Sequence, residues 1–346
     1  MTTLLLSGLA VTAAVCASLT AAVIPLLRRA RVVDVPGDRS LHKTPVPRGG
    51  GLAIVLSASL ATWATVLAAV HRHDTVHSLT GLGLALMGLA TVLAFALLGL
   101  IEDLFSVSVR TRLVLQLALG AGLGLVAHST FEVSLWWTPA ICVGTAALVN
   151  ATNFMDGANG LACGHALLTS LWYVQVAAVA PVAGLGLVMV SVAGACLGFL
   201  PFNTPRAKVF LGDSGSYALG SAWAFAVTAC LAQGVAVEAA LAPVLVLLAD
   251  TGYTLWMRLR AGQCWYTPHR LHVYQRLVCA GWPHWASALL VTLAAASCSA
   301  LAAGSLLTSN RLWMPQVAMA AVLILYLRMP SIIGAPNPFP TLRRAR

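Results

Sequence analysis

The sequence predicts an all-α fold, a polytopic integral membrane bundle of about eleven transmembrane helices, on three observations. The 346-residue chain is 59% hydrophobic and 9% charged, whereas about a quarter of the residues of a water-soluble domain are normally charged. Its apolar residues gather in runs close to the roughly 20 residues that a helix needs to cross about 30 Å of hydrocarbon. None of these runs alternates like a barrel strand, so helices are the expected spanning elements.

Eleven apolar runs qualify as spans when the chain is read in order. They cover residues 3–27, 51–70, 79–101, 112–127, 135–149, 161–180, 182–200, 215–233, 235–257, 285–307 and 312–327. The fifth is short, and only Ala180-Pro181 divides the sixth from the seventh, so the count can differ by one. The first run lacks the basic start of a secretory signal and is followed by Arg28 and Arg29, which predicts a retained anchor.

Basic residues orient the predicted bundle, because positively charged loops stay in the cytoplasm. With the N-terminus out and the C-terminus in, eighteen of the twenty Lys and Arg residues lie in inner loops, and only Arg72 and Arg311 lie outside. The net charge of +10 is therefore mainly a topology signal, although it also favours anionic membrane lipids and phosphates. No nucleic-acid motif accompanies it. The eight cysteines show no zinc spacing and are expected to pack as small apolar residues.

Seven of the ten acidic residues fall on the cytoplasmic half of this topology. They are Asp34 and Asp38 in the first inner loop, Glu102 and Asp103 at the third span, Asp156 after the fifth, Asp213 before the eighth, and Asp250 inside the ninth. Carboxylates that converge in this way suit Mg²⁺, which takes one or two carboxylates and completes its shell with water and phosphates. Nearby basic side chains would hold phosphate oxygens. The pattern predicts metal-assisted phosphoryl chemistry at the inner leaflet.

Each motif, taken alone, has a simpler interpretation that the sequence leaves open. The acids of GLIEDLFSVSVRTRLVLQ (99–116) could pair with the arginines of the same segment. The aspartate of FLGDSGS (210–216) could be a helix N-cap, and HRLHVYQRL (269–277) could be an interfacial turn with ordinary surface histidines. Asp250 either bonds to the neighbouring Thr251, Tyr253 or Thr254 or belongs to the site.

Five motifs occur in an order that resembles the polyprenyl-phosphate N-acetylhexosamine-1-phosphate transferase family. They are DVPGDRSLHKTPVPRGGG (34–51), GLIEDL (99–104), NATNFMDGANGLACG (150–164), FLGDSGSYALG (210–220) and TPHRLHVYQRLVCAG (267–281). They extend from the first inner loop to the last large one, which makes the signal far more specific than a lone glycine motif. A passive scaffold has no reason to gather them.

This resemblance implies transfer of an N-acetylaminosugar-1-phosphate from a UDP-sugar to undecaprenyl phosphate, with release of UMP and a requirement for Mg²⁺ or Mn²⁺. The implied catalytic residues are Glu102, Asp103, Asp156, His269 and His272, and the implied metal ligands are Asp213, Asp103 and Asp156. The expected substrate-binding residues are Asn150, Asn153 and Asn159 with the basic Lys43, Arg48, Arg206, Lys208 and Arg270. One transmembrane domain, residues 1–346, would carry this site on its cytoplasmic loops.

The chain departs from the family pattern at two positions. Glu102 stands where the family usually has Asp, which keeps the charge but lengthens its reach. Asn159 replaces the second acid of the DGxDG loop, which removes a charge and adds an amide donor. We therefore expect Asn159→Ala to abolish or greatly reduce transfer and Asn159→Asp largely to retain it. Direct attack by the lipid phosphate, aided by Asp103 or Glu102, is favoured over a covalent aspartyl-phosphate route.

The motifs look most like the branch that initiates O-antigen and lipopolysaccharide synthesis with 6-deoxy donors such as UDP-N-acetylfucosamine or UDP-N-acetylquinovosamine. A bacterial inner membrane location follows from the resemblance, and a homodimer is a further expectation. The alternative function is a secondary transporter, which also needs about eleven helices. Transporters place ionisable groups near the membrane midplane on repeated halves, whereas most acids here lie at cytoplasmic helix ends.

Overall fold

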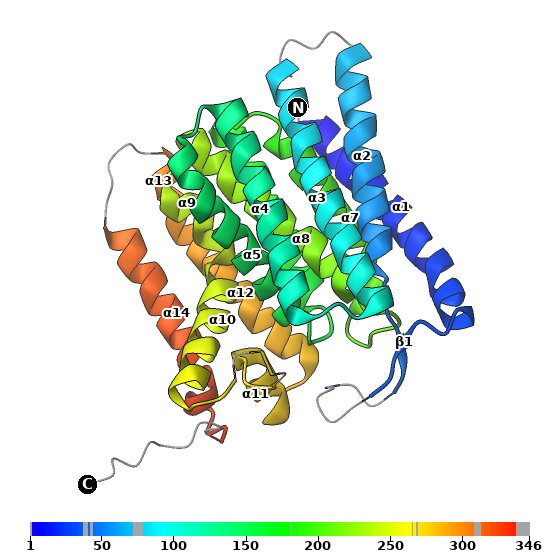
Figure 1. Ribbon diagram of the computed structural model, residues 1–346, viewed down its shortest axis with the longest axis vertical. Helices are drawn as coiled ribbons and strands as arrows, with labels where there is room; N and C mark the ends of the chain where they lie inside the picture. The colour runs from blue at the N-terminus through cyan, green and yellow to red at the C-terminus, as the bar shows by residue number, and fades with distance from the viewer. Residues whose placement is uncertain are drawn as a thin grey trace.

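The computed structural model describes residues 2–36, 41, 44–71, 79–180, 182–264, 266–267, 269–307 and 313–336, and nearly all of them lie in a bundle of long helices (Figure 1). The long helices are α1 (Thr2–Arg29), α2 (Gly51–His71), α3 (Leu79–Phe105), α4 (Val109–Phe131), α5 (Thr138–Phe154), α6 (Leu161–Val179), α7 (Leu185–Asn203), α8 (Gly212–Ala232), α10 (Leu245–Arg260), α12 (His284–Ala302) and α14 (Met314–Ile332). Short elements are η1 (Leu135–Trp137), α9 (Val237–Leu241), η2 (Ala242–Val244), α11 (Val273–Cys279) and α13 (Gly304–Leu307).

The spans confirm the predicted polytopic all-α fold. Ten helical segments in the described ranges are long and apolar enough to cross a membrane, and α5, with 17 residues, is the short fifth span of the sequence. The ninth span is not one straight helix, because η2 interrupts it between α9 and α10 at Ala242-Pro243-Val244. Helix α1 begins at one end of the bundle and α14 ends at the other (Figure 1). Which end faces the cytoplasm stays a prediction.

Helix α8 forms the centre of the bundle, with 83% of its membrane window buried, against 17% for α1 and for α14. It packs closely on its neighbours because small residues stand at the crossings, as is usual where helices meet in lipid. A Cβ atom added to Gly99 on α3 would collide with the backbone of Asp213 on α8, and one added to Gly51 on α2 would collide with Gly215. These close crossings bring the ends of α2 and α3 to the first turn of α8.

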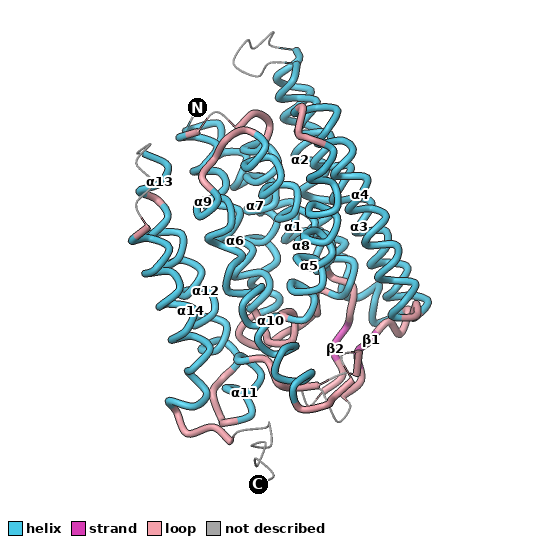
Figure 2. Tube along the Cα trace, turned by 60° about the vertical axis from the view of Figure 1, so that its left-hand side comes forward, coloured by secondary structure: helices cyan, strands magenta, loops and turns pink. Residues whose placement is uncertain are grey.

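One end of the bundle, the lower end in Figure 1, carries most of the irregular structure, and we call it the site end. The two-stranded sheet β1 (Val33–Asp34) and β2 (Val46–Pro47) lies there, as do α11 and the loops that follow α3, α5 and α7 (Figures 1 and 2). The basic residues that end α1 and α10 also lie at this end. The positive-inside prediction requires this arrangement.

The cysteines behave as the sequence predicts. Within the described residues all eight are free, and five are buried, namely Cys16, Cys163, Cys196, Cys230 and Cys298. They fill space in the apolar core.

Candidate active site

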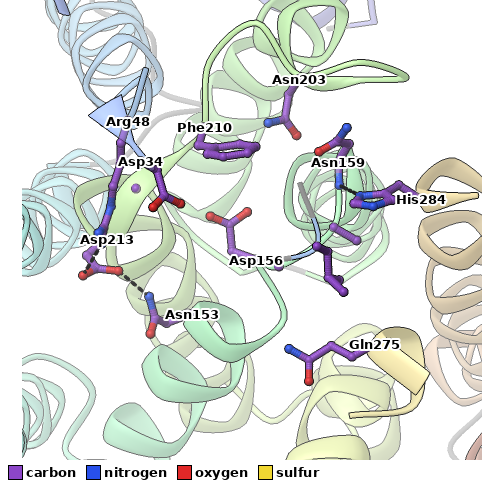
Figure 3. Close-up of a pocket in the computed structure, with 14 residues that line it drawn as sticks. Asp34, Arg48, Asn153, Asp156, Asn159, Asn203, Phe210, Asp213, Gln275 and His284 are labelled. Carbon is purple, nitrogen blue, oxygen red and sulfur yellow. Dashed lines mark hydrogen bonds and ion pairs between the residues drawn. The ribbon is translucent and has the colours of Figure 1, made fainter. Parts of the chain in front are cut away.

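A polar cavity of about 350 Å³ opens at the site end, between segments that are far apart in the sequence (Figure 3). It is lined by Asp34, Leu41, Arg48, Asn153, Asp156, Gly157, Ala158, Asn159, Asn203, Phe210, Gly212, Asp213, Gln275 and His284. The four longest predicted motifs each contribute lining residues, and GLIEDL supports the wall from behind. The carboxylate of Asp156 points into the middle of the space (Figure 3).

The two acids of GLIEDL have different partners. Successive positions on a helix point about 100° apart, so both carboxylates cannot face the same partner. Glu102 turns to Arg112 on α4, with 3.3 Å between its Oε1 and the arginine Nη1, and does not line the cavity. Asp103 turns to α8, where its Oδ1 and Oδ2 accept the backbone N–H groups of Asp213 and Ser214, both at 3.0 Å.

Asp103 therefore caps the first turn of α8 from a different helix. Its side chain is 4% exposed, and its Oδ1 also bonds to Nε of Arg48 at 2.9 Å. A carboxylate at a helix N-terminus satisfies orphan N–H groups and complements the positive end of the helix dipole. The simpler interpretation made Asp213 the N-cap of α8, but Leu211 holds that position and Asp213 lies within the first turn.

Arg48 connects the two aspartates. Its Nε contacts Asp103, and its Nη2 lies 2.8 Å from Oδ2 of Asp213. The backbone sets this geometry. Arg48 follows β2 and forms a parallel β-bridge with Phe210, and the backbone N–H of Phe210 donates to Pro47 O at 2.8 Å. The planar guanidinium fork suits two carboxylates at once, which an ammonium group does not match. The Arg48 side chain is 38% exposed and lines the cavity.

Asp213 is held on its other side by Asn153 from α5. The Asn153 Nδ2 atom donates to Asp213 Oδ1 at 2.7 Å and lies 3.0 Å from Ser216 Oγ (Figure 3). Both side chains line the cavity, as the sequence predicts for this part of the site. Asn150, one helical turn earlier, does not reach it: its Nδ2 donates to Oε1 of the buried Gln116 on α4 at 2.5 Å.

Asp156 lies in the loop between α5 and α6 and has no ion pair among the described residues. Burial, and then the negative charges of Asp213 and Asp103, raise its pKa well above the usual range, and Arg48 offsets them only in part. Gly157 beside it presses against Tyr274 of α11, so that a Cβ atom would collide with the tyrosine hydroxyl. The loop therefore has no room for a side chain at 157.

The donor set around Asp156 fits a divalent cation such as Mg²⁺. No ready-made group of three ligands exists among the described residues, but Mg²⁺ usually needs only one or two carboxylates and takes its other oxygens from water and substrate phosphates. Asp156 would be the first ligand and Asp213 the second. Asp213 is 15% exposed and lines the cavity, whereas Asp103 is 4% exposed and does not line it, so Asp103 lies behind the site as a support.

The opposite wall is built around Asn159. Its backbone N–H donates to Nδ1 of His284 on α12 at 3.2 Å (Figure 3). Its Nδ2 donates to Pro205 O at 3.1 Å. The next residue, Gly160, has φ of 79° and donates its N–H to Asn203 Oδ1 at 2.8 Å. The side-chain amide of Asn159 therefore donates a hydrogen bond that the acid usual in the family at this position could not donate.

The two histidines of HRLHVYQRL do not line the cavity. His272 is 3% exposed and its Nδ1 bonds to Asp250, so it is not the ordinary surface residue of the simpler interpretation. His269 is half-buried, and its Nδ1 accepts the N–H of Leu271 at 3.2 Å. Burial, and then His272 and Arg258, lower the pKa of His269 to about 4, so the ring is neutral at physiological pH.

The remaining predicted basic residues that the structure describes do not line the cavity wall. Arg206 and Lys208 are exposed beside it, and the Lys208 ammonium lies over the ring of Phe202 at 5.8 Å. Arg270 is half-buried in the loop before α11. Lys43 lies outside the described residues.

Among the residues of the wall that the sequence did not single out are Leu41, Ala158, Asn203, Phe210, Gly212, Gln275 and His284. All of these except Asn203 and His284 belong to recognised motifs, so motif membership could have found them. His284 and Asn203 are a lone histidine at the start of one span and a lone asparagine at the end of another. Only the tertiary structure brings them to Asn159 and Gly160.

Comparisons with known proteins agree with this geometry. The model of glycosyl transferase family 4 matches residues 84–232. A Mycobacterium leprae decaprenyl-phosphate N-acetylglucosaminephosphotransferase is 32% identical over 78% of this chain and 75% of its own length. A probable undecaprenyl-phosphate N-acetylglucosaminyl 1-phosphate transferase of Bacillus subtilis is 27% identical over 78% and 77%. A phospho-N-acetylmuramoyl-pentapeptide-transferase of Desulforamulus reducens is 30% identical over 58% and 66%.

The level of identity to the mycobacterial relatives and its extent decide the family, and the cavity at the end of a helical bundle agrees with it. The chain belongs to the polyprenyl-phosphate N-acetylhexosamine-1-phosphate transferases of glycosyl transferase family 4, multi-pass membrane enzymes that transfer a sugar phosphate to a polyprenyl phosphate.

Proposed function

We propose that this protein transfers an N-acetylaminosugar-1-phosphate from a UDP-sugar to undecaprenyl phosphate or a related polyprenyl phosphate, with release of UMP. The reaction takes place at the inner face of a bacterial cytoplasmic membrane, requires Mg²⁺ or Mn²⁺, and begins the synthesis of a lipid-linked cell-surface glycan. One observation carries the proposal: Asp156, Asp213 and Arg48 meet in a polar cavity at one end of an apolar bundle.

The cavity contains the charges that such a transfer needs. A donor diphosphate and an acceptor phosphate are both anionic, so bringing them together requires positive charge between and around them. Mg²⁺, when bound, would neutralise the charge that develops on the diphosphate oxygens. Asp156 and Asp213 are the residues that would hold it, and Asn153 orients Asp213 through its 2.7 Å hydrogen bond.

Arg48 is the residue that we assign to the acceptor phosphate. Its guanidinium is anchored by Asp103 and Asp213 on one side, while more than a third of its side chain is exposed to the cavity. Asn159 and His284, on the opposite wall, are then left for the donor. The donor and acceptor thus approach Asp156 from two sides.

Direct attack by the acceptor phosphate oxygen is the proposed route. Asp103 is a poor base or nucleophile, because Arg48 and two backbone N–H groups already bond to its oxygens. Glu102 pairs with Arg112 away from the cavity. The acceptor phosphate is itself an oxyanion whose second pKa is about 6, so its attack needs no strong base. The lipid phosphate oxygen forms the new P–O bond to the donor's β-phosphorus as the bond to UMP breaks.

The donor sugar is the least constrained part of the proposal. The relatives in mycobacteria and Bacillus subtilis are named for N-acetylglucosamine, and the loop motifs of this chain predict a 6-deoxy N-acetylaminosugar of the O-antigen type. All these donors share the acetamido group and the UDP diphosphate, which is the chemistry that the cavity must accept.

The test is transfer of label by the purified protein. Radiolabelled UDP-N-acetylglucosamine, UDP-N-acetylfucosamine and UDP-N-acetylquinovosamine are each incubated with undecaprenyl or decaprenyl phosphate. Label in the lipid phase with added Mg²⁺ or Mn²⁺, and none after chelation by EDTA, supports the proposal and identifies the donor. Uptake of label into sealed vesicles without lipid labelling would instead support the transporter alternative.

A further inference from the structure

Asp250 is a fully buried carboxylate on α10 that does not line the cavity, and its hydrogen bonds reach α14, the start of α11 and one residue of α10 itself. Its Oδ2 accepts from the hydroxyl of Tyr326 on α14 at 2.7 Å. Its Oδ1 accepts from Nδ1 of His272 at 3.0 Å, and both oxygens receive the N–H of Val273, at 3.2 and 3.1 Å. Of the neighbours that the sequence suggested, Thr254 donates at 3.2 Å.

A carboxylate inside a membrane span is expensive, and its cost falls only when its oxygens are fully bonded. An apolar side chain could pack α10 against α14 more cheaply. It could not, however, fix the start of α11, which needs an acceptor for His272 and for the first backbone N–H of the helix. The arrangement therefore favours a geometric role for Asp250 over a purely cohesive one.

Helix α11 and the residue before it connect Asp250 to the cavity through a series of contacts. The His272 ring stacks between Phe154 and Tyr274, with centroid distances of 6.0 and 6.1 Å. The Tyr274 hydroxyl donates to Phe154 O at 2.8 Å, and it touches Gly157, the neighbour of Asp156. Gln275, the next residue of α11, lines the cavity itself. A continuous set of contacts thus joins Asp250 to the loop of Asp156.

We propose that Asp250 is a positioning residue for sugar-phosphate transfer, which holds His272 and α11 so that Tyr274 and Gln275 fix the donor wall of the cavity, with Tyr326 tying α14 to the same wall. This inference rests on the proposed function. It makes α14, the last helix described and with α1 the least buried of the candidate spans, part of the active-site framework, and it assigns His272 to support instead of substrate contact.

The experiment compares four variants with the wild type in the transfer assay, each checked for a monodisperse profile and an unchanged melting temperature. Tyr326→Phe removes one hydrogen bond from Asp250. Its matched control is Tyr173→Phe, which removes an equally buried hydroxyl that donates to Ala240 O at 2.8 Å, far from the cavity lining. His272→Asn keeps an amide donor near the Nδ1 position, and His272→Ala keeps none.

The expected result is a split between substrates. Tyr326→Phe raises the donor KM by about fivefold or more and leaves the acceptor KM within about twofold, whereas Tyr173→Phe changes neither. His272→Ala lowers kcat/KM for the donor by about tenfold or more, and His272→Asn recovers it to within about threefold of the wild type.

Two outcomes overturn the inference. One is a Tyr326→Phe enzyme that matches the Tyr173→Phe control. The other is a folded His272→Asn enzyme as inactive as His272→Ala, which would mean that the ring itself contacts substrate. A wild-type protein that transfers no sugar phosphate at all would overturn the proposed function and this inference with it, and that result is separate from both.

Discussion

The carboxylate of Asp103 on α3 holds the first turn of α8, because it accepts the backbone N–H of Asp213 at 3.0 Å. Asp213 is thereby fixed in position before any ligand arrives, and Arg48 completes the arrangement by contacting both carboxylates. Two residues that the sequence predicts as metal ligands thus occupy different places. Asp103 supports the site, and Asp213 faces it.

Asp103→Asn should therefore lose both stability and activity. The amide cannot accept two backbone N–H groups and Arg48 at once, so its own NH₂ group faces a donor. Loss of a hydrogen bond to a charged acceptor of this kind costs about 1.5–3 kcal/mol. Thermal unfolding in detergent and the transfer rate should both report the loss. An Asp103→Asn protein with wild-type stability would show that α8 does not depend on this cap.

Asp156→Asn should separate the two properties. Transfer should fall by about a hundredfold or more, because a cavity carboxylate that faces the diphosphate is lost. Stability in metal-free buffer should hold or rise, because burial and neighbouring charges raise the pKa of Asp156 and make its ionised form unfavourable in the folded protein.

The sign of this effect gives it a pH dependence. Because the pKa of Asp156 is raised in the folded protein, the native protein binds this proton more tightly than the unfolded chain does. The stability that the protonated carboxyl contributes is lost as the pH rises through its folded-state pKa. The advantage of Asp156→Asn over the wild type should therefore be larger at pH 7 than at pH 4. Melting temperatures of both proteins at the two pH values, in EDTA, check this. A larger advantage at pH 4 would contradict it.

The structure alters the prediction that the sequence makes for Asn159. The sequence alone predicts that Asn159→Asp largely retains transfer. The structure adds that Asn159 Nδ2 donates to Pro205 O at 3.1 Å, and an aspartate would instead place an oxygen against that carbonyl. Both Asn159→Asp and Asn159→Ala should therefore raise the donor KM, by about tenfold for a lost and uncompensated hydrogen bond. A fully active Asn159→Asp enzyme would restore the expectation from sequence.

The chain's own pattern predicts the fold well because hydropathy alone determines the spans in lipid. Each long apolar run contains a long helix, and the short fifth run became the 17-residue α5. The break of the ninth span at η2 was not predicted, although Pro243 was a visible signal for it.

The site was predicted less completely, because motifs identify loops but do not say where each side chain points. Glu102 and Asp103 are adjacent in one motif, yet they face different helices. In the histidine motif, Gln275 lines the cavity, whereas His272 bonds to Asp250. These choices depend on contacts with α14 and α8, which no local pattern contains.

Gly157 offers the sharpest steric test of the loop that carries Asp156. A Cβ atom at this position would collide with the Tyr274 hydroxyl, which is itself held by Phe154 O at 2.8 Å and cannot retreat without losing that bond. Gly157→Ala should therefore displace the loop and lower transfer by about tenfold or more, with a smaller loss of stability.

The control is Gly164→Ala on α6, where the nearest atom to the new methyl group is Thr292 Oγ1 at 3.8 Å. That variant should keep full activity and be slightly more stable, because alanine is favoured over glycine inside a helix. Adding Tyr274→Phe to Gly157→Ala removes the colliding hydroxyl and should recover part of the transfer rate. If the losses of activity of the two single variants simply add up in the double variant, the two residues do not interact. The loop of Asp156 is then positioned by something other than α11.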